Sequence, residues 1–193
     1  MARPRSSGTS SASPSAWSER WRPLALAAVG LAIAAYLTAF QVRLVGSVWE
    51  PFFGSGSRTI LTSSVARALP IPDASLGMAA YLADLVLGFV GGPARWRTMP
   101  WIVFLFGAVV GLAGLTSLLL VVAQAAIIHA WCTLCLASAA ISLGIVPLAW
   151  PEVRAALGHV RQLRAGGAPL AIALRGSSAE DPAATGMATE QEG

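Results

Sequence analysis

The sequence predicts an all-α integral membrane protein built as a bundle of four transmembrane helices. Hydrophobic residues make up 55% of the 193-residue chain and charged residues only 11%. Apolar runs long enough to cross a bilayer recur along it, separated by segments that carry arginine. This composition is typical of a membrane protein and argues against a soluble domain.

A disordered leader and two helices are expected in the first half of the chain. Residues 1–22 are rich in Ser, Pro, Ala and Arg and lack apolar periodicity. The uncharged run Pro23–Gln41 exceeds the ~7–15 apolar residues of a secretory signal and predicts a transmembrane helix. Ala74–Val90 predicts a second one, which contains Asp84. This acid either faces a bundle interior or cavity, or lies near the helix end and reaches the surface; the sequence leaves both open.

The polar segment Val45–Asp73 separates these two helices. Within it, the apolar residues of Arg58–Leu69 recur at helical spacing and leave a polar opposite face. This pattern predicts a short amphipathic helix at the membrane surface, in the first extracytoplasmic loop. Ser57 is its expected N-cap, and Pro70 is expected to end it.

The longest apolar stretch, Pro100–Trp150, contains no Asp, Glu, Lys or Arg. As one helix it would extend about 75 Å, against a hydrocarbon core of ~30 Å, so it must cross twice. Gln124 and His129 are its most polar residues and mark the turn. The third and fourth helices are therefore expected over Pro100–Val122 and roughly Ala130–Ala149.

Residues 23–150 thus form the expected membrane domain, and residues 151–193 a polar, mostly disordered tail. All thirteen basic residues are arginine. Alternate ends of the four helices are flanked by Arg20 and Arg22, by Arg95 and Arg97, and by Arg154, Arg161 and Arg164, whereas the opposing loop carries Arg43, Arg58 and Arg67 together with Glu50 and Asp73. Because basic residues concentrate on the cytoplasmic side, both termini are expected there, in a multi-pass protein of the cell (inner or plasma) membrane. Arginines placed beside apolar runs favour contact with membrane lipid over nucleic acid.

The only two cysteines, Cys132 and Cys135, lie at the start of the last apolar run. Residues three apart share a helix face, about 5 Å from one another, which is within the range of a disulfide. At a helix start the dipole and free N–H groups favour a reactive thiolate. We therefore favour redox chemistry over a role as small buried side chains. With His129 the pair would supply three metal ligands, but no fourth is evident, so no metal is expected.

Three segments combine with the predicted helices into a pattern that is similar to a known family. They are Trp131-Cys132-Thr133-Leu134-Cys135, Gly56-Ser57-Arg58-Thr59-Ile60-Leu61-Thr62-Ser63, and Leu69-Pro70-Ile71-Pro72-Asp73-Ala74-Ser75-Leu76-Gly77 leading to Tyr81. In this order they resemble the vitamin K epoxide reductase family over roughly Pro23–Trp150. The resemblance implies a four-helix bundle that holds a quinone, of the menaquinone or ubiquinone type, beside the cysteine pair.

The resemblance also implies roles for the cysteines and for one loop hydroxyl. Cys135 maps to the cysteine that faces the quinone, and Cys132 to the one that exchanges with incoming thiols. A serine of the loop helix maps best to Ser63, with Thr62 as the alternative if the register slips by one.

The implied quinone site continues toward the second helix. Asp73 holds the place of a polar residue that hydrogen-bonds a quinone oxygen, or else serves only as the N-cap of that helix. Trp131 and Tyr81 complete the expected site. Most family members carry a second cysteine pair in the first loop, and this chain has none; Ser57 lies where its second cysteine would be.

The leading hypothesis is a membrane quinone-linked thiol–disulfide oxidoreductase that forms disulfides in an extracytoplasmic, thioredoxin-like partner. The alternative is a non-catalytic membrane binding or assembly protein with the same fold, which the missing loop cysteines favour. An unrelated disulfide-forming quinone reductase fits poorly, because those proteins place their first cysteine pair near the second helix and need a second pair.

Overall fold

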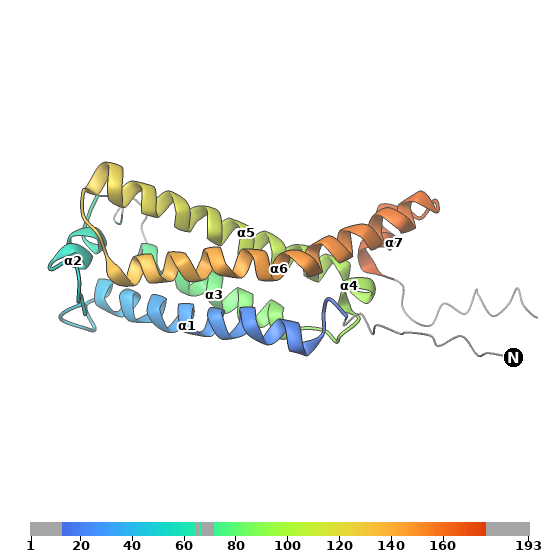
Figure 1. The fold of residues 1–193 in the computed structure, drawn as a ribbon, viewed down its shortest axis with the longest axis horizontal. Helices are drawn as coiled ribbons and strands as arrows, with labels where there is room; N and C mark the ends of the chain where they lie inside the picture. The colour runs from blue at the N-terminus through green and yellow to red at the C-terminus, as the bar shows by residue number, and fades with distance from the viewer. Residues whose placement is uncertain (1–12, 65, 67–71, 177–193) are drawn as a thin grey trace, which may run out of the picture.

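Four long helices lie side by side in the computed structural model, which describes residues 13–64, 66 and 72–176 (Figure 1). They are α1 (Trp17–Gln41), α3 (Asp73–Phe89), α5 (Pro100–Ala123) and α6 (Thr133–Ala165). Each packs against two others, so that the order around the bundle is α1, α3, α5, α6. The regular elements of the described residues are all helical, which confirms the predicted class.

Short elements connect the long helices at the two ends of the bundle. They are α2 (Gly56–Leu61), α4 (Arg95–Thr98), α7 (Leu170–Arg175) and a π-helical turn, Gln124–Ile128, that continues α5. Figure 1 places α2 and the turn between α5 and α6 at one end, which we call the cysteine end (residues 42–64 and 124–135). It places α4 and the N-terminal segment at the other, which we call the arginine end (residues 13–22 and 88–98).

The first helix begins earlier than predicted, at Trp17 instead of Pro23. The expected disordered leader is therefore wrong from Trp17 onward, and residues 1–12 lie outside the described residues. Charged residues between Trp17 and Pro23 interrupt the apolar run in the sequence, but Arg20 is buried and its guanidinium group is bonded to backbone carbonyls. A charge with partners inside the protein does not end a helix.

The last helix continues beyond its predicted end near Ala149, as far as Ala165. The prediction of a mostly disordered tail is therefore wrong for residues 151–165, and α7 adds a further helical segment. Residues 177–193 lie outside the described residues. The physical reason is again a paired charge, because Glu152 is buried in α6 and forms an ion pair with Arg95.

The loop helix is shorter than predicted. It spans Gly56–Leu61 instead of Arg58–Leu69, and residues 65 and 67–71 lie outside the described residues. Ser57 is inside this helix and not its N-cap, because its hydroxyl donates to the Glu50 carboxylate instead of capping a backbone N–H. A tertiary partner has displaced the local cap.

Among the described residues, three helices are long and apolar enough to cross a membrane by length and composition. They are α1, α5 with its π-helical continuation to Ile128, and α6. With 17 residues, α3 is shorter. At 1.5 Å per residue it extends about 25 Å, which is near the lower limit for a span.

The bundle core is apolar and is centred on Tyr81. Its ring lies against Gly30 of α1, where a Cβ atom would overlap the ring. The hydroxyl donates to the Ser138 carbonyl at 2.7 Å and lies 2.8 Å from the Ser142 hydroxyl, so α3 is tied to α6. The other buried residues of the cluster are Ala27, Ala34, Phe106, Val110, Ile145 and Ala149.

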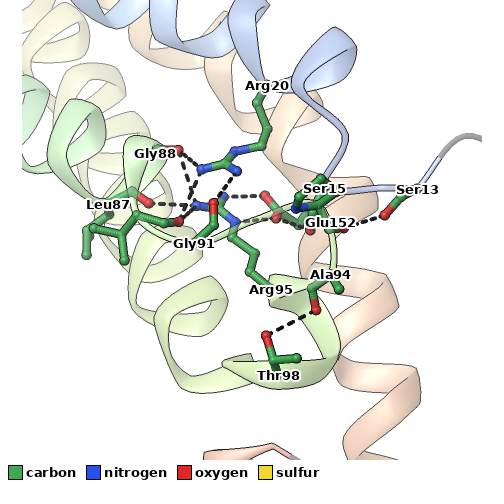
Figure 2. A network of polar contacts seen from close by, with 12 residues as sticks. Ser13, Ser15, Arg20, Leu87, Gly88, Gly91, Ala94, Arg95, Thr98 and Glu152 are labelled. Carbon is green, nitrogen blue, oxygen red and sulfur yellow. Dashed lines mark hydrogen bonds and ion pairs between the residues drawn. The ribbon is translucent and has the colours of Figure 1, made fainter. Parts of the chain in front are cut away.

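At the arginine end, two arginines surround the last turn of α3 (Figure 2). The Arg95 guanidinium donates to the carbonyls of Leu87, Gly88 and Val90, at 2.7, 3.3 and 3.0 Å. Arg20 donates to the carbonyls of Gly88, Val90 and Gly91. Since the last carbonyls of a helix have no partner within it, these side chains satisfy groups that would otherwise be buried unpaired.

One carboxylate balances this pair of charges. Arg95 and Glu152 form a two-bond ion pair, with Nε–Oε1 and Nη2–Oε2 both at 2.5 Å. Ser15 also donates to Glu152, which joins the N-terminal segment to α6. Four parts of the chain therefore meet in one buried polar network: residues 13–20, the end of α3, α4 and α6.

We predict that Arg95→Ala destabilises the bundle by about 3–5 kcal/mol, because it leaves the Glu152 carboxylate buried without a partner. The measurement is the SDS fraction at which the purified protein unfolds. Arg97→Ala is the matched control, since Arg97 is exposed two residues away. Replacing both members, Arg95→Met with Glu152→Leu, should recover only the part of the loss that comes from Glu152, because the carbonyls of Leu87, Gly88 and Val90 still lack their Arg95 donor. Equal unfolding of Arg95→Ala and the parent would contradict the role given to the ion pair.

Candidate functional site

The two cysteines form a disulfide at the start of α6. Their Cα atoms are 5.2 Å apart, as expected for residues three apart in a helical turn. Cys132 is the N-cap residue and Cys135 lies at the third position of the helix. The Cys135 N–H donates to the Cys132 sulfur at 3.1 Å. A thiolate at Cys132 would therefore receive a hydrogen bond from the helix that it caps.

The turn before α6 is held by Gln124, which is buried. Its side-chain oxygen accepts the Cys132 N–H at 3.3 Å, and its backbone carbonyl accepts the Ala130 N–H. His129 closes the turn in the left-handed conformation, with φ of 53°. The polar residues that mark this turn in the sequence therefore also fix the direction in which the cysteine pair enters α6.

A third acceptor at this helix start comes from the first loop. The Glu50 carboxylate accepts the Thr133 N–H at 3.1 Å and also the Thr133 hydroxyl. On the loop side it accepts the Ser57 hydroxyl of α2. We call this group of three residues, Glu50, Ser57 and Thr133, the loop clamp. It joins the loop to the first residue of α6, directly beside Cys132.

These bonds determine the ionisation of Glu50. Burial by itself would raise the pKa of this carboxyl group, but the hydrogen bonds from Ser57, Thr133 and the Phe52 backbone outweigh it and lower the pKa to about 2. The carboxylate is therefore charged at neutral pH and lies at a helix N-terminus, where a negative charge is favourable.

The clamped loop packs against the residues on both sides of Cys132, which is completely buried. Gly56 lies so close to the Trp131 carbonyl that a Cβ atom at this position would overlap it, so only glycine fits there. Cys132 is 0% exposed, whereas Cys135 is half-buried. An incoming thiol can therefore reach Cys132 only after the loop has moved.

Asp73 lies at the junction of α1 and α3. It is the first residue of α3 and not its N-cap, which is Pro72. Its carboxylate accepts from the Gln41 side chain, whose amide nitrogen also donates to the Leu61 carbonyl at 3.3 Å. Gln41 thus connects the end of α1 to α2 and α3, and it holds the polar residue that the sequence analysis assigns to the quinone.

The remaining predicted residues lie in the first loop, beside the disulfide and in the bundle core. The Ser63 hydroxyl accepts the Ala66 N–H within its own turn. The Thr62 hydroxyl donates to the Arg58 carbonyl. Trp131 is partly exposed beside the disulfide. Tyr81 is buried in the core, and its hydroxyl donates to the carbonyl of Ser138, which lies one turn of α6 after Cys135. None of these four side chains hydrogen-bonds to the cysteine pair in the part of the chain described.

Sequence reasoning missed Glu50, Gln41 and the role of Thr133. In the sequence, Glu50 stands out only as a negative charge among the arginines of the first loop. One signal was present: it is the sole carboxylate in the first loop before Asp73, and it precedes a proline in an aromatic segment. Its partner Thr133 lies far along the chain, and no local pattern connects them.

The model of the Vitamin K epoxide reductase family matches residues 21–150, well over half of the chain, and this range holds both the disulfide and the loop clamp. The chain belongs to this family. The match confirms the family assigned from the sequence, with a single Cys132–Cys135 pair and no second cysteine pair in the first loop. The family is a four-helix membrane bundle and generally a thiol and quinone oxidoreductase. No curated protein matches the chain significantly.

The family implies a quinone, and the residues near Cys135 suit one. Cys135 is half-buried, and the Gln41–Asp73 pair provides polar groups where α1 meets α3. A separate cavity of about 160 Å³ lies within the first loop, and its lining includes Glu50, Ser57 and Arg58 but neither Cys135 nor Asp73. Among the described residues, no group of three His, Cys, Asp or Glu side chains could hold a metal ion.

We predict that the loop clamp is stable from neutral pH down to about pH 4.5 and is lost between about pH 4.5 and 2. The pKa of Glu50 is lowered from its ordinary value of 4.5, which applies in the unfolded chain, to about 2 in the folded protein. The clamp therefore stabilises the folded state fully above pH 4.5, and this contribution is lost as the pH falls from about 4.5 to about 2. The measurement is amide hydrogen exchange of residues 46–61, corrected for intrinsic rates.

Glu50→Gln should remove this acid dependence, whereas Glu19→Gln at the arginine end should leave it in place. An identical pH profile in the parent and in Glu50→Gln would contradict the assignment.

Proposed function

We propose that this protein is a membrane oxidoreductase that passes electrons from partner thiols through Cys132 and Cys135 to a quinone, and so forms disulfides in its partner. The observation that carries the proposal is the disulfide at the start of α6 in a member of this family. Membership of this family supports a quinone, of the menaquinone or ubiquinone type, as the electron acceptor.

The first step is thiol–disulfide exchange at Cys132. A thiolate of the partner attacks the Cys132 sulfur, a mixed disulfide forms and the Cys135 thiolate leaves. Cys135 is suited to leave, because it lies in the first turn of α6, where the helix dipole stabilises negative charge. A second partner thiol then attacks the mixed disulfide, which releases the oxidised partner and the reduced Cys132–Cys135 pair.

The second step restores the disulfide. A bound quinone supplies the acceptor for two electrons and two protons. Asp73, held by Gln41, is the residue we assign to one quinone oxygen, and Trp131 and Tyr81 remain proposed parts of the site. Ser63 remains a proposed active-site hydroxyl. The apolar side chains of the bundle exclude water from this region.

We further propose that α3 is a fourth span and that both termini face the cytoplasm. The buried polar network at the arginine end supports this, because it satisfies the last carbonyls of a helix too short to extend farther. The cysteine end then lies at the extracytoplasmic face of the cell membrane, which is an oxidising environment. A thioredoxin-like protein of that compartment is the proposed partner.

One observation favours a non-catalytic alternative, in which the chain keeps the fold as a binding or assembly protein. Cys132 is fully covered, and the clamp residue Ser57 occupies the place where the family carries a loop cysteine. In that case the disulfide would be structural and would not exchange with thiols.

We predict that Cys135→Ser, expressed in cells, accumulates an adduct through Cys132 that a reductant releases. In this variant the Cys132 thiolate attacks the disulfide of an oxidised partner and displaces one partner thiolate, which forms the mixed disulfide. Because Cys135 is missing, no thiol of this protein can resolve it. The measurement is non-reducing electrophoresis of membranes after rapid acid quenching. The control is the double variant Cys132→Ser with Cys135→Ser, which should form none. If Cys135→Ser also forms none, while the parent is inert toward small dithiols, the non-catalytic alternative is correct.

A further inference from the structure

We infer that Glu50 sets the reduction potential of the Cys132–Cys135 pair, and that its carboxylate keeps the pair less oxidising than the helix start alone would make it. Glu50 acts through the residue next to Cys132, so it is a positioning and tuning residue and touches no substrate. The inference deepens the proposed function, because it concerns the same disulfide.

The start of α6 contains two opposing influences on a Cys132 thiolate. The helix dipole and the Cys135 N–H, 3.1 Å from the Cys132 sulfur, stabilise it. The Glu50 carboxylate lies at the same terminus and accepts the neighbouring Thr133 N–H at 3.1 Å. It thereby uses one of the donors that favour the thiolate and adds a like charge beside it.

Among the described residues, Glu50 is the carboxylate that is bonded to this terminus. Asp73, at the start of α3, is instead bonded to Gln41. Arg58 lines the same cavity as Glu50. Since Glu50 is fixed by Ser57 as well as by Thr133, its charge cannot turn away from the pair while the loop remains closed.

The redox consequence has a definite sign. With a dithiol as reductant, two electrons and two protons pass to the pair: the Cys132–Cys135 bond breaks, and the dithiol closes to its cyclic disulfide. A negative charge beside the product disfavours the thiolate form and therefore disfavours reduction. Removing that charge should make the pair easier to reduce, and thus a stronger oxidant.

The experiment is an equilibrium titration of the full-length protein in detergent with reduced and oxidised dithiothreitol at pH 8, followed by thiol labelling. Glu50→Gln keeps the shape and the acceptor oxygen but loses the charge. We expect its equilibrium constant for reduction to rise about tenfold, which corresponds to about 30 mV for a two-electron couple. Glu50→Ala should shift in the same direction, and Glu50→Asp, which keeps the charge, should stay near the parent.

Two controls separate charge from loop position. Ser57→Ala removes one bond to the Glu50 carboxylate but keeps its charge and both of its bonds to Thr133, so its equilibrium constant should change much less than that of Glu50→Gln. Glu19→Gln removes an exposed charge at the far end and should titrate as the parent does. The inference is overturned if neutral replacements of Glu50 titrate as the parent does, or if Ser57→Ala shifts as far as Glu50→Gln. A parent disulfide that no dithiol reduces would instead count against the proposed function itself.

Discussion

The N–H groups at the start of α6 have no acceptor within their own helix, and the architecture of the cysteine end follows from satisfying them. Gln124 from the preceding turn, Glu50 from the first loop and the Cys132 sulfur each accept one of these groups. The same bonds bring a distant loop over the disulfide and cover Cys132. The same hydrogen bonds therefore satisfy the backbone N–H groups of α6 and limit the access of thiols to Cys132.

At the arginine end, backbone carbonyl groups instead of N–H groups lack partners within their own helix. The last carbonyls of α3 need donors, and Arg20 and Arg95 supply them, while Glu152 balances part of their charge. In a hydrocarbon environment an unpaired backbone group costs several kcal/mol, so a short helix such as α3 is viable only with partners of this kind. Each end of the bundle thus relies on side chains from other helices and loops, and the apolar core around Tyr81 lies between them.

Properties encoded locally could be predicted from the sequence. Apolar periodicity and the absence of charge located the four helices, and the spacing of Cys132 and Cys135 indicated the disulfide. The predicted helix bounds are wrong where a charged residue has a partner far along the chain. Arg20 and Glu152 indicate helix ends in the sequence, because the sequence does not show that each has a buried partner. Ser57 was predicted as a cap for the same reason, since the Glu50 carboxylate that takes its hydroxyl is defined only by the fold. The bond from Glu50 to Thr133 depends on how the loop packs on the bundle, and no local motif encodes that packing.

The proposed function requires that Cys132 and Cys135 exchange electrons with a quinone. The most direct measurement is a single anaerobic turnover of the prereduced protein with one equivalent of a soluble ubiquinone or menaquinone analogue. Because the chain has only two cysteines, the stoichiometry has one interpretation. We expect that two thiols disappear for each quinol that forms, with the Cys132–Cys135 disulfide as the protein product. Thiols that persist while the quinone remains oxidised would contradict it.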